Sequence, residues 1–157
     1  MRAFRALLTL TLVCSSLTAV AAVTATARIV SAANTFLATL DAAQRQKVLY
    51  AFNDEKQRAT WSNLPTSFVP RGGLSLKDMT AAQQTAAMAL VSSVLSPRGY
   101  EKVQQIMEGD QVLKTKEGNN PIFGKDLYYI SFLGKPSEKD PWMLQFGGHH
   151  LALNITI

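Results

Sequence analysis

Two adjacent histidines near the end of the chain are the residues whose types and spacing most directly suggest chemistry. His149 and His150 are the only histidines in the 157-residue sequence, and they follow the glycine pair Gly147-Gly148. Imidazole exchanges protons near neutral pH more readily than any other side chain, and it is also a common metal ligand. The pair therefore suggests either a divalent metal site or acid–base catalysis.

The sequence pattern around the two histidines predicts a different position for each of them. The run from His149 to Ile157 alternates between apolar and polar residues, which predicts a β-strand. Consecutive strand residues point to opposite faces, so His149 is expected to pack against the core and His150 to lie on the less apolar face. We therefore predict His150 as the catalytic residue. A bulge at Gly147-Gly148 would re-aim both rings, and a purely structural, hydrogen-bonded role for the pair stays open.

A metal site built on this pair needs further ligands. A mononuclear site takes about three protein ligands, so His150 and His149 would need an acid to complete it. Asp126, Asp140 or residues beyond Ile157 are the candidates. No cofactor other than a divalent metal is suggested by the sequence.

Four further residues are candidates for binding a ligand. Arg58 and Arg71 carry guanidinium groups whose planar fork suits a carboxylate or another anion, although each can equally hold its own loop in place. Trp61 and Trp142 are expected either as anchors of the core and loop or as aromatic platforms for a carbohydrate. An enzyme, such as a metal-assisted hydrolase, and a non-catalytic module that binds an extracellular polysaccharide, small molecule or protein therefore both stay open.

Several function classes are excluded or made less favourable by what the sequence lacks. It contains no G-x-S-x-G, H-E-x-x-H, Walker or G-x-G-x-x-G motif. Its formal net charge of +5 comes from scattered residues without a dense basic block, which argues against nucleic-acid binding. The single cysteine, Cys14, lies in a segment expected to be removed, so the mature chain would have no thiolate chemistry.

The N-terminal segment has the features of a secretory signal. Arg2 and Arg5 precede the uncharged stretch Ala6–Ala27, which is rich in small residues. We expect cleavage after residue 22, or as late as residue 27, and hence a secreted or periplasmic protein of the bacterial envelope with no stable membrane anchor. An uncleaved anchor is the alternative, since the stretch is long enough to span a bilayer; lipidation at Cys14 is a weaker one, because bulky Val13 precedes it.

The remaining residues, 23–157, are predicted to form a single α+β domain in which N-terminal helices pack on a C-terminal antiparallel sheet. Capping boxes at Asp41 and Thr80, and the Ser96-Pro97 pair, predict helix starts. Residues 53–74 are expected to form an ordered loop. Strands are predicted at 127–133, 142–146 and 149–157.

Asp110 interrupts the apolar face of the third predicted helix. Gly109 is expected to end that helix, and Asp110 to cap a short continuation after it. The alternative interpretation is a buried functional acid on the apolar face of an unbroken helix.

The final strand suggests an incomplete domain. Leu151, Leu153, Ile155 and Ile157 share one face of it, and the sequence stops without a turn or a polar tail. An apolar edge strand of this kind is prone to aggregate. We therefore expect a domain that is truncated at its C-terminus.

Five segments carry distinctive motifs: FNDEKQRATWSNLP, RGGLSLKDMTAAQ, LSPRGYEKV, YYISFLGKPSEKDPW and QFGGHHLALNITI. In this order they resemble the bacterial and fungal family known as domain of unknown function 3500. Leu133 stands where the family has phenylalanine, and two glycines follow Arg71, but neither departure touches the histidines. The resemblance covers nearly all of the mature chain. It implies no particular activity, and it implies that relatives are longer than this chain.

Overall fold

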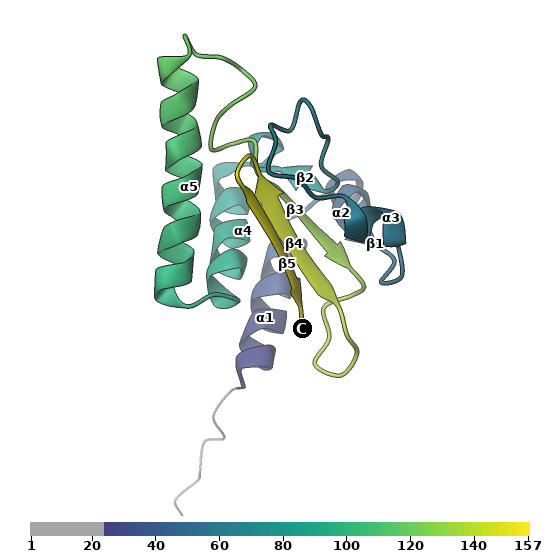
Figure 1. Ribbon diagram of the computed structural model, residues 1–157. Coiled ribbons are helices and arrows are strands. Elements are labelled where there is room, and N and C mark those ends of the chain that lie inside the picture. The colour runs from purple at the N-terminus through teal and green to yellow at the C-terminus, as the bar shows by residue number, and fades with distance from the viewer. Residues whose placement is uncertain (1–23) are drawn as a thin grey trace, which may run out of the picture.

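The structure, a computed structural model, describes residues 24–157 as helices and one mixed sheet (Figure 1). The helices are α1 (Ala25–Ala38), α2 (Ala42–Val48), α3 (Glu55–Ala59), the 3-10 helix η1 (Leu76–Asp78), α4 (Ala81–Ser93) and α5 (Pro97–Lys116). The strands are β1 (Leu49–Tyr50), β2 (Leu74–Ser75), β3 (Tyr129–Leu133), β4 (Met143–Gly148) and β5 (Leu151–Thr156).

The sheet confirms the predicted α+β class. Its strand order is β1-β3-β4-β5, and β2 pairs with β3 beside this path. The pairs β2–β3, β3–β4 and β4–β5 are antiparallel, whereas β1 runs parallel to β3. The sheet is therefore mostly but not wholly antiparallel, because a two-residue strand from the helical half of the chain joins it.

One apolar cluster fills the space between the sheet and α1, α4 and α5, which lie together on one side of it (Figure 1). Alternate residues of β3 and β4 point into this cluster, as the two-residue period of a strand requires. They are Ile130, Phe132, Leu144 and Phe146. The Phe132 ring stacks on Phe36 of α1 at 6.2 Å and on Trp142 at 6.0 Å between ring centroids. The opposite, outer face of the sheet is left to α3 and the loop that follows it.

Local signals for helix starts are confirmed. Asp41 and Thr80 each form a capping box, with the side chains of Gln44 and Gln83 returning to the cap backbone. Ser96 caps α5 through the Gly99 N–H, and Pro97 occupies its first turn. These devices satisfy backbone donors that a helix start would otherwise leave unpaired.

The middle of the chain holds elements that periodicity did not reveal. The helix opened by Asp41 ends at Val48, since the next two residues pair with β3 as β1. The predicted loop 53–74 contains the five-residue helix α3, which Asp54 caps. Such short elements carry less than two full turns or pleats, so they show no period in the sequence.

The interpretation of Gly109 as a helix end and Asp110 as a cap is wrong. α5 runs without a break from Pro97 to Lys116. The residues Val103, Met107 and Asp110 recur at helical spacing and are all buried. Asp110 is therefore the buried acid that was the alternative interpretation.

The third predicted strand begins two residues later than expected. Gly147 and Gly148 pair regularly with Ala152 and Leu151, so they form no bulge. His149-His150 make the turn between β4 and β5. The strand itself covers residues 151–156.

The predicted signal segment lies outside the described residues except at its last boundary. Thr24 caps α1, so cleavage after residue 22 would leave the helix whole, whereas cleavage after residue 27 would remove its first turn. Within residues 24–157 there is no helix with both the length and the hydropathy needed to cross a membrane.

Candidate functional site

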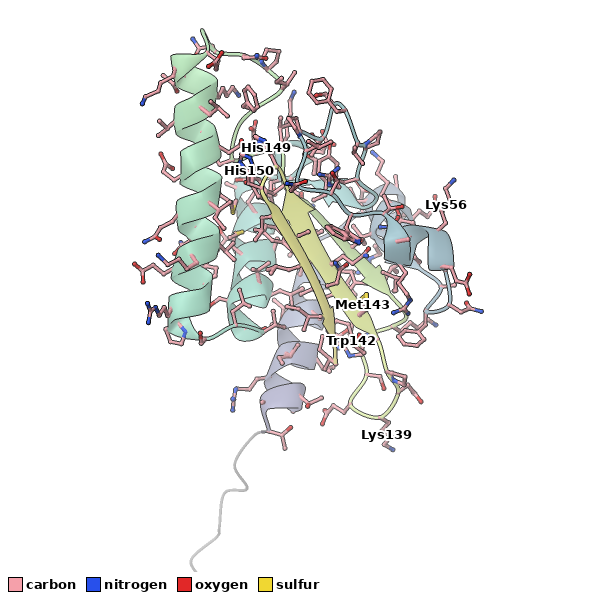
Figure 2. The ribbon with its side chains drawn as sticks, in the orientation of Figure 1. Lys56, Lys139, Trp142, Met143, His149 and His150 are labelled. Atoms are coloured by element: carbon pink, nitrogen blue, oxygen red, sulfur yellow. The ribbon has the colours of Figure 1, made fainter. Side chains whose placement is uncertain are left out.

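The two histidines occupy the tip of the β4–β5 hairpin, far from Trp142 at the other end of β4 (Figure 2). His150 has a positive φ of 60°, and its N–H donates to the Asn63 carbonyl at 3.0 Å. The imidazole rings stack on each other, with centroids 3.6 Å apart. The prediction that they point to opposite faces of a strand is therefore wrong, because a turn takes the place of the strand. His149 is nevertheless buried and His150 exposed, as expected.

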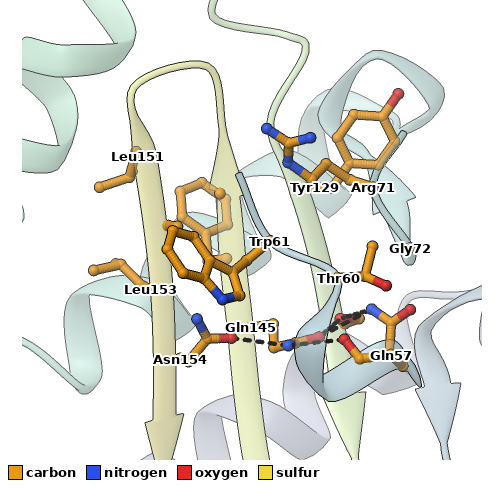
Figure 3. A pocket seen from close by; sticks show the side chains of 14 residues that line it. Gln57, Thr60, Trp61, Arg71, Gly72, Tyr129, Gln145, Leu151, Leu153 and Asn154 are labelled. Atoms are coloured by element: carbon orange, nitrogen blue, oxygen red, sulfur yellow. Dashed lines mark hydrogen bonds between the residues drawn. The ribbon is translucent and has the colours of Figure 1, made fainter. Parts of the chain in front are cut away.

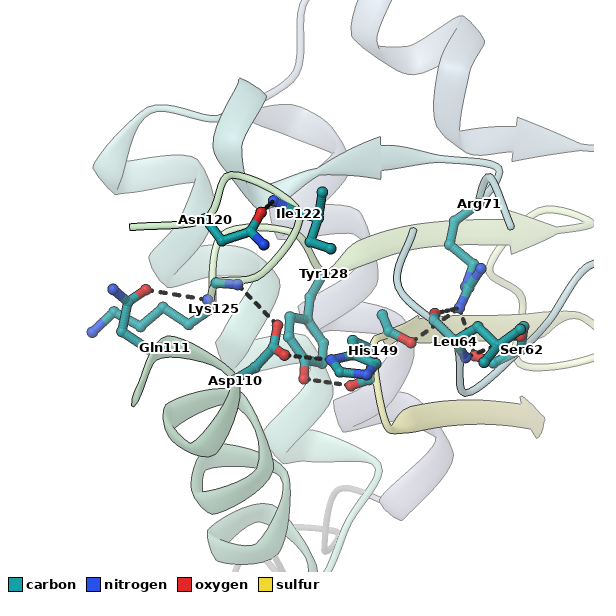
Figure 4. Close-up of polar contacts among 12 residues, drawn as sticks. Ser62, Leu64, Arg71, Asp110, Gln111, Asn120, Ile122, Lys125, Tyr128 and His149 are labelled. Atoms are coloured by element: carbon teal, nitrogen blue, oxygen red, sulfur yellow. Dashed lines mark hydrogen bonds and ion pairs between the residues drawn. The ribbon is translucent and has the colours of Figure 1, made fainter. Parts of the chain in front are cut away.

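His149 forms a short hydrogen bond with the buried carboxyl group of Asp110 (Figure 4). The distance from Nδ1 of His149 to Oδ1 of Asp110 is 2.6 Å. The other oxygen of Asp110 accepts the Gly124 N–H at 2.9 Å. Asp110 is only 3% exposed and His149 only 7%. The pair therefore joins α5 to the hairpin in an environment that is largely shielded from solvent.

Two aromatic residues complete the surroundings of His149. The Tyr128 hydroxyl donates to the His149 carbonyl at 2.7 Å (Figure 4), and the Phe123 ring lies 5.3 Å from the imidazole. Burial of Tyr128, and secondly the negative charge of Asp110, raise the pKa of its hydroxyl above the ordinary value. Tyr128 therefore stays protonated and donates its hydrogen bond over a wide pH range.

The Asp110 contact sets what the His149 ring can do chemically. An ionised carboxylate only accepts hydrogen bonds, so a neutral imidazole facing it carries its proton on Nδ1. The lone pair of Nε2 is then left to accept a proton or to bind a metal ion. Asp110 thus fixes the orientation of His149 and, when ionised, the tautomer of its neutral ring.

The geometry does not favour one metal ion shared by the two histidines. Rings stacked with an angle of 28° between their planes have lone pairs that run side by side and do not converge on one point. Within residues 24–157, no three His, Cys, Asp or Glu side chains gather closely enough to hold a metal. Of the acids considered as further ligands, Asp126 lies 4.0 Å from Lys114, and Asp140 accepts from Ser137 in the β3–β4 turn.

The two candidate arginines bind the protein's own backbone. Arg71 donates to the carbonyl groups of Val69, Ser62 and Leu64 in its own loop and to that of Gly148 in β4. Burial lowers its pKa from the ordinary value. Arg58 donates to the Phe52 carbonyl, and its guanidinium lies 4.8 Å from the centre of the Phe52 ring. Both arginines therefore hold loops, which was the simpler of the two interpretations.

The two tryptophans have different environments. Trp142 is fully buried, and its indole N–H donates to the Ser137 carbonyl at 3.1 Å. Its ring therefore has no free face for a carbohydrate. Trp61 is 59% exposed and lines a pocket on the outer face of the sheet. Of the four predicted ligand-binding residues, Trp61 and Arg71 meet at this pocket, whereas Arg58 and Trp142 do not line it.

Sequence reasoning did not select Asp110 or Tyr128 as site residues. The signal for Asp110 was present, because a carboxylate on the apolar stripe of a helix is costly unless it has a partner. Its partner lies 39 residues away in sequence, and no local pattern connects the two. Tyr128 sits in an apolar run and looks like any other core aromatic residue.

Together these features define an α+β protein with a buried aspartate–histidine pair beneath the turn of a β-hairpin. The family model described as "Protein of unknown function (DUF3500)" matches residues 22–157. The chain belongs to this family, which confirms the resemblance seen in its motifs. No curated protein and no solved structure matches the chain.

The raised pKa of Tyr128 predicts a loss of stability in alkaline solution. Above pH ~10 the unfolded chain releases the tyrosine proton, while the folded chain retains it. The free energy of unfolding should therefore fall as the pH rises from that point. Tyr128→Phe should cost about 1 kcal/mol at neutral pH, for the lost hydrogen bond, and should have a shallower alkaline decline. Urea unfolding at pH 8 to 11 measures both, and parallel declines in the two proteins would contradict the prediction.

Proposed function

We propose that this protein is an exported hydrolase in which His149, oriented by Asp110, is the general base. The observation that carries the proposal is the 2.6 Å hydrogen bond between Nδ1 of His149 and the buried Asp110 carboxylate. A carboxylate that orients an imidazole and stabilises its charged form is a recurring arrangement in general-base catalysis.

The energetic cost of the pair supports a functional role. Burying a carboxylate is unfavourable even when it is hydrogen-bonded, and an apolar residue of similar size often stabilises such a position equally well. Asp110 lies on a helix face that is otherwise apolar, with Val103 and Met107 buried on the same stripe. Buried ionisable groups that break the local pattern in this way concentrate at functional sites.

The proposed step uses only His149 and water. Nε2 of His149 accepts a proton from a water molecule while the water oxygen forms a bond to the electrophilic carbon or phosphorus of the substrate. The proton then passes from the imidazolium to the leaving group as its bond to that atom breaks. Asp110 stabilises the imidazolium between the two transfers, and the enzyme returns to its initial state.

Access to the imidazole is partly restricted. The His149 side chain is 9% exposed, with Phe123 and His150 packed against its ring. His150 is exposed and belongs to the turn, so it can move without disturbing the core. His150 is thus placed to control approach to His149, a role other than the catalytic one expected from the sequence.

The test is hydrolysis of chromogenic carboxylic esters, glycosides and phosphoesters by the purified protein. We expect turnover of at least one class, and we expect His149→Asn to lower kcat by about 10²–10⁴-fold. Asparagine can still donate to Asp110, so the fold is kept, but it cannot accept a proton. Asp110→Asn should also lower kcat, because it removes the charge that stabilises the imidazolium. Asp140→Asn, at an exposed acid in the β3–β4 turn, is its matched control and should leave kcat unchanged.

A further variant separates the two histidines. Glycine suits the positive φ of residue 150, so His150→Gly removes the second imidazole while keeping the turn. Retained activity in His150→Gly supports His149 as the base. If His150→Gly loses activity while His149→Asn keeps it, the proposal is contradicted and His150 is favoured as the base. Failure to hydrolyse any of the three substrate classes would also count against it.

A further inference from the structure

A second candidate site lies on the outer face of the sheet, away from the Asp110–His149 pair. This pocket is a shallow depression that encloses only about 30 Å³, and it is lined by residues from α3, the following loop and strands β3, β4 and β5 (Figure 3). A ligand would therefore lie over it and not inside it. Apart from Arg71, its lining residues are uncharged. The pocket is therefore suited to a polar but neutral ligand.

The floor of the pocket is a row of polar side chains across three strands. Ser131, Gln145 and Asn154 are direct neighbours in the strand register. The Gln145 amide donates to the Asn154 oxygen at 2.8 Å and accepts from the Ser131 hydroxyl at 3.1 Å. Gln57 of α3 lies over this row and donates to the Gln145 oxygen at 2.9 Å (Figure 3). The row is thus fixed in position before any ligand arrives.

Other polar groups of the pocket are left without partners. Within the described part of the chain, no hydrogen bond uses the side-chain nitrogen of Asn154 or the hydroxyl of Tyr129, although both residues line the pocket. An amide N–H₂ provides two donors, and a phenol provides one donor and one acceptor. The amide lies beside Trp61, whereas the Tyr129 hydroxyl points away from it (Figure 3). The two amide donors therefore suit the hydroxyl oxygens of a ligand that lies against Trp61.

Trp61 adds an apolar surface beside these donors. Its indole is 59% exposed and lies in front of β4 and β5 (Figure 3). The loop that carries it is anchored by the four carbonyl contacts of Arg71. A large aromatic face on an anchored loop, next to a free amide group, complements the two parts of a sugar ring, its apolar C–H face and its hydroxyl edge.

We propose that this pocket binds a sugar residue of a neutral polysaccharide. The ring stacks on the indole of Trp61, and its hydroxyl groups bond to the free side-chain nitrogen of Asn154. Gln57, Gln145 and Ser131 are bonded to one another and form a rigid floor, not the primary contact, because the Gln145 amide already has partners. The proposal does not depend on hydrolysis by His149, which lies at the hairpin tip and does not line the pocket.

The experiment measures binding of the full chain to an array of plant, fungal and bacterial glycans, followed by titration calorimetry with the best oligosaccharide. We expect Trp61→Ala to weaken binding at least tenfold, Asn154→Ala to weaken it severalfold, and Trp61→Phe to retain part of the affinity. The matched control is Phe68→Ala, since Phe68 is an aromatic residue of the same loop, is 68% exposed and does not line the pocket. The Phe68→Ala variant should bind the oligosaccharide with the same affinity as the wild-type protein.

Two results would overturn the proposal. One is the absence of binding to any glycan on the array by folded wild-type protein. The other is equal loss of affinity in Trp61→Ala and Phe68→Ala, which would indicate a nonspecific apolar loop surface. His149→Asn separates this proposal from the hydrolase proposal, because it should bind glycans with wild-type affinity whether or not it has lost turnover.

Discussion

Replacing Trp142 with alanine is expected to lower the free energy of unfolding by about 3–5 kcal/mol, the range for deleting a large aromatic side chain from a packed core. The indole is fully buried and stacks on Phe132 at 6.0 Å. Its removal leaves a cavity beneath β4 and frees the Ser137 carbonyl from its hydrogen bond. Urea unfolding monitored by circular dichroism measures the loss.

The control for this prediction is the same substitution at the other tryptophan. Trp61 is 59% exposed, so Trp61→Ala should change stability by only about 0.5 kcal/mol, as is usual for surface positions. The comparison also separates the two roles considered for these residues. Similar stability losses in both variants would mean that Trp61 is part of the core and that its loop is packed more tightly than the exposed fraction indicates.

Removing only the histidine of the buried pair should be nearly as damaging. Among the described residues, His149→Leu leaves the Asp110 carboxylate, which is 3% exposed, with the Gly124 N–H as its one remaining hydrogen-bond donor. Removing one member of a buried pair so that a carboxylate is left without its partner typically costs about 3–5 kcal/mol. The free energy of unfolding at pH 7, measured by urea denaturation, should fall within that range.

The double variant Asp110→Leu/His149→Leu should recover much of this loss. Replacing both members of a buried pair with apolar residues is often neutral or stabilising, since no charge then remains buried. A double-mutant cycle with the two single variants gives the coupling energy directly. Additive losses, with no recovery in the double variant, would show that Asp110 and His149 stabilise the fold independently.

The parts of the fold that could be predicted are those specified by short-range chemistry. Asp41 and Thr80 each have a glutamine three residues later, and this spacing alone is enough to place a helix start. The elements that were missed depend on distant partners. Leu49-Tyr50 is a strand only because β3 lies beside it, and the sequence around it continues the pattern of the preceding helix.

The candidate site likewise combines residues that a local pattern reveals with residues that depend on distant partners. The two histidines could be recognised from their type and spacing, but their geometry could not, because the alternating pattern predicts a strand that begins at His149, where the structure has a turn. The short turn places them in contact with each other. Asp110 and Gln57 were beyond local reasoning, since their site contacts lie 39 and 88 residues away. A residue whose partner is that distant can be flagged as unusual, but its partner cannot be named.

The four carbonyl contacts of Arg71 have a mechanical consequence. One guanidinium ties the loop that carries Trp61 to Gly148, the residue immediately before His149. The His150 N–H bond to the Asn63 carbonyl joins the same loop to the turn at a second point. The pocket and the hairpin tip therefore share one anchored loop, although they lie on different parts of the sheet. Loss of the Arg71 contacts should thus disturb the turn as well as the pocket, so the two sites are structurally coupled.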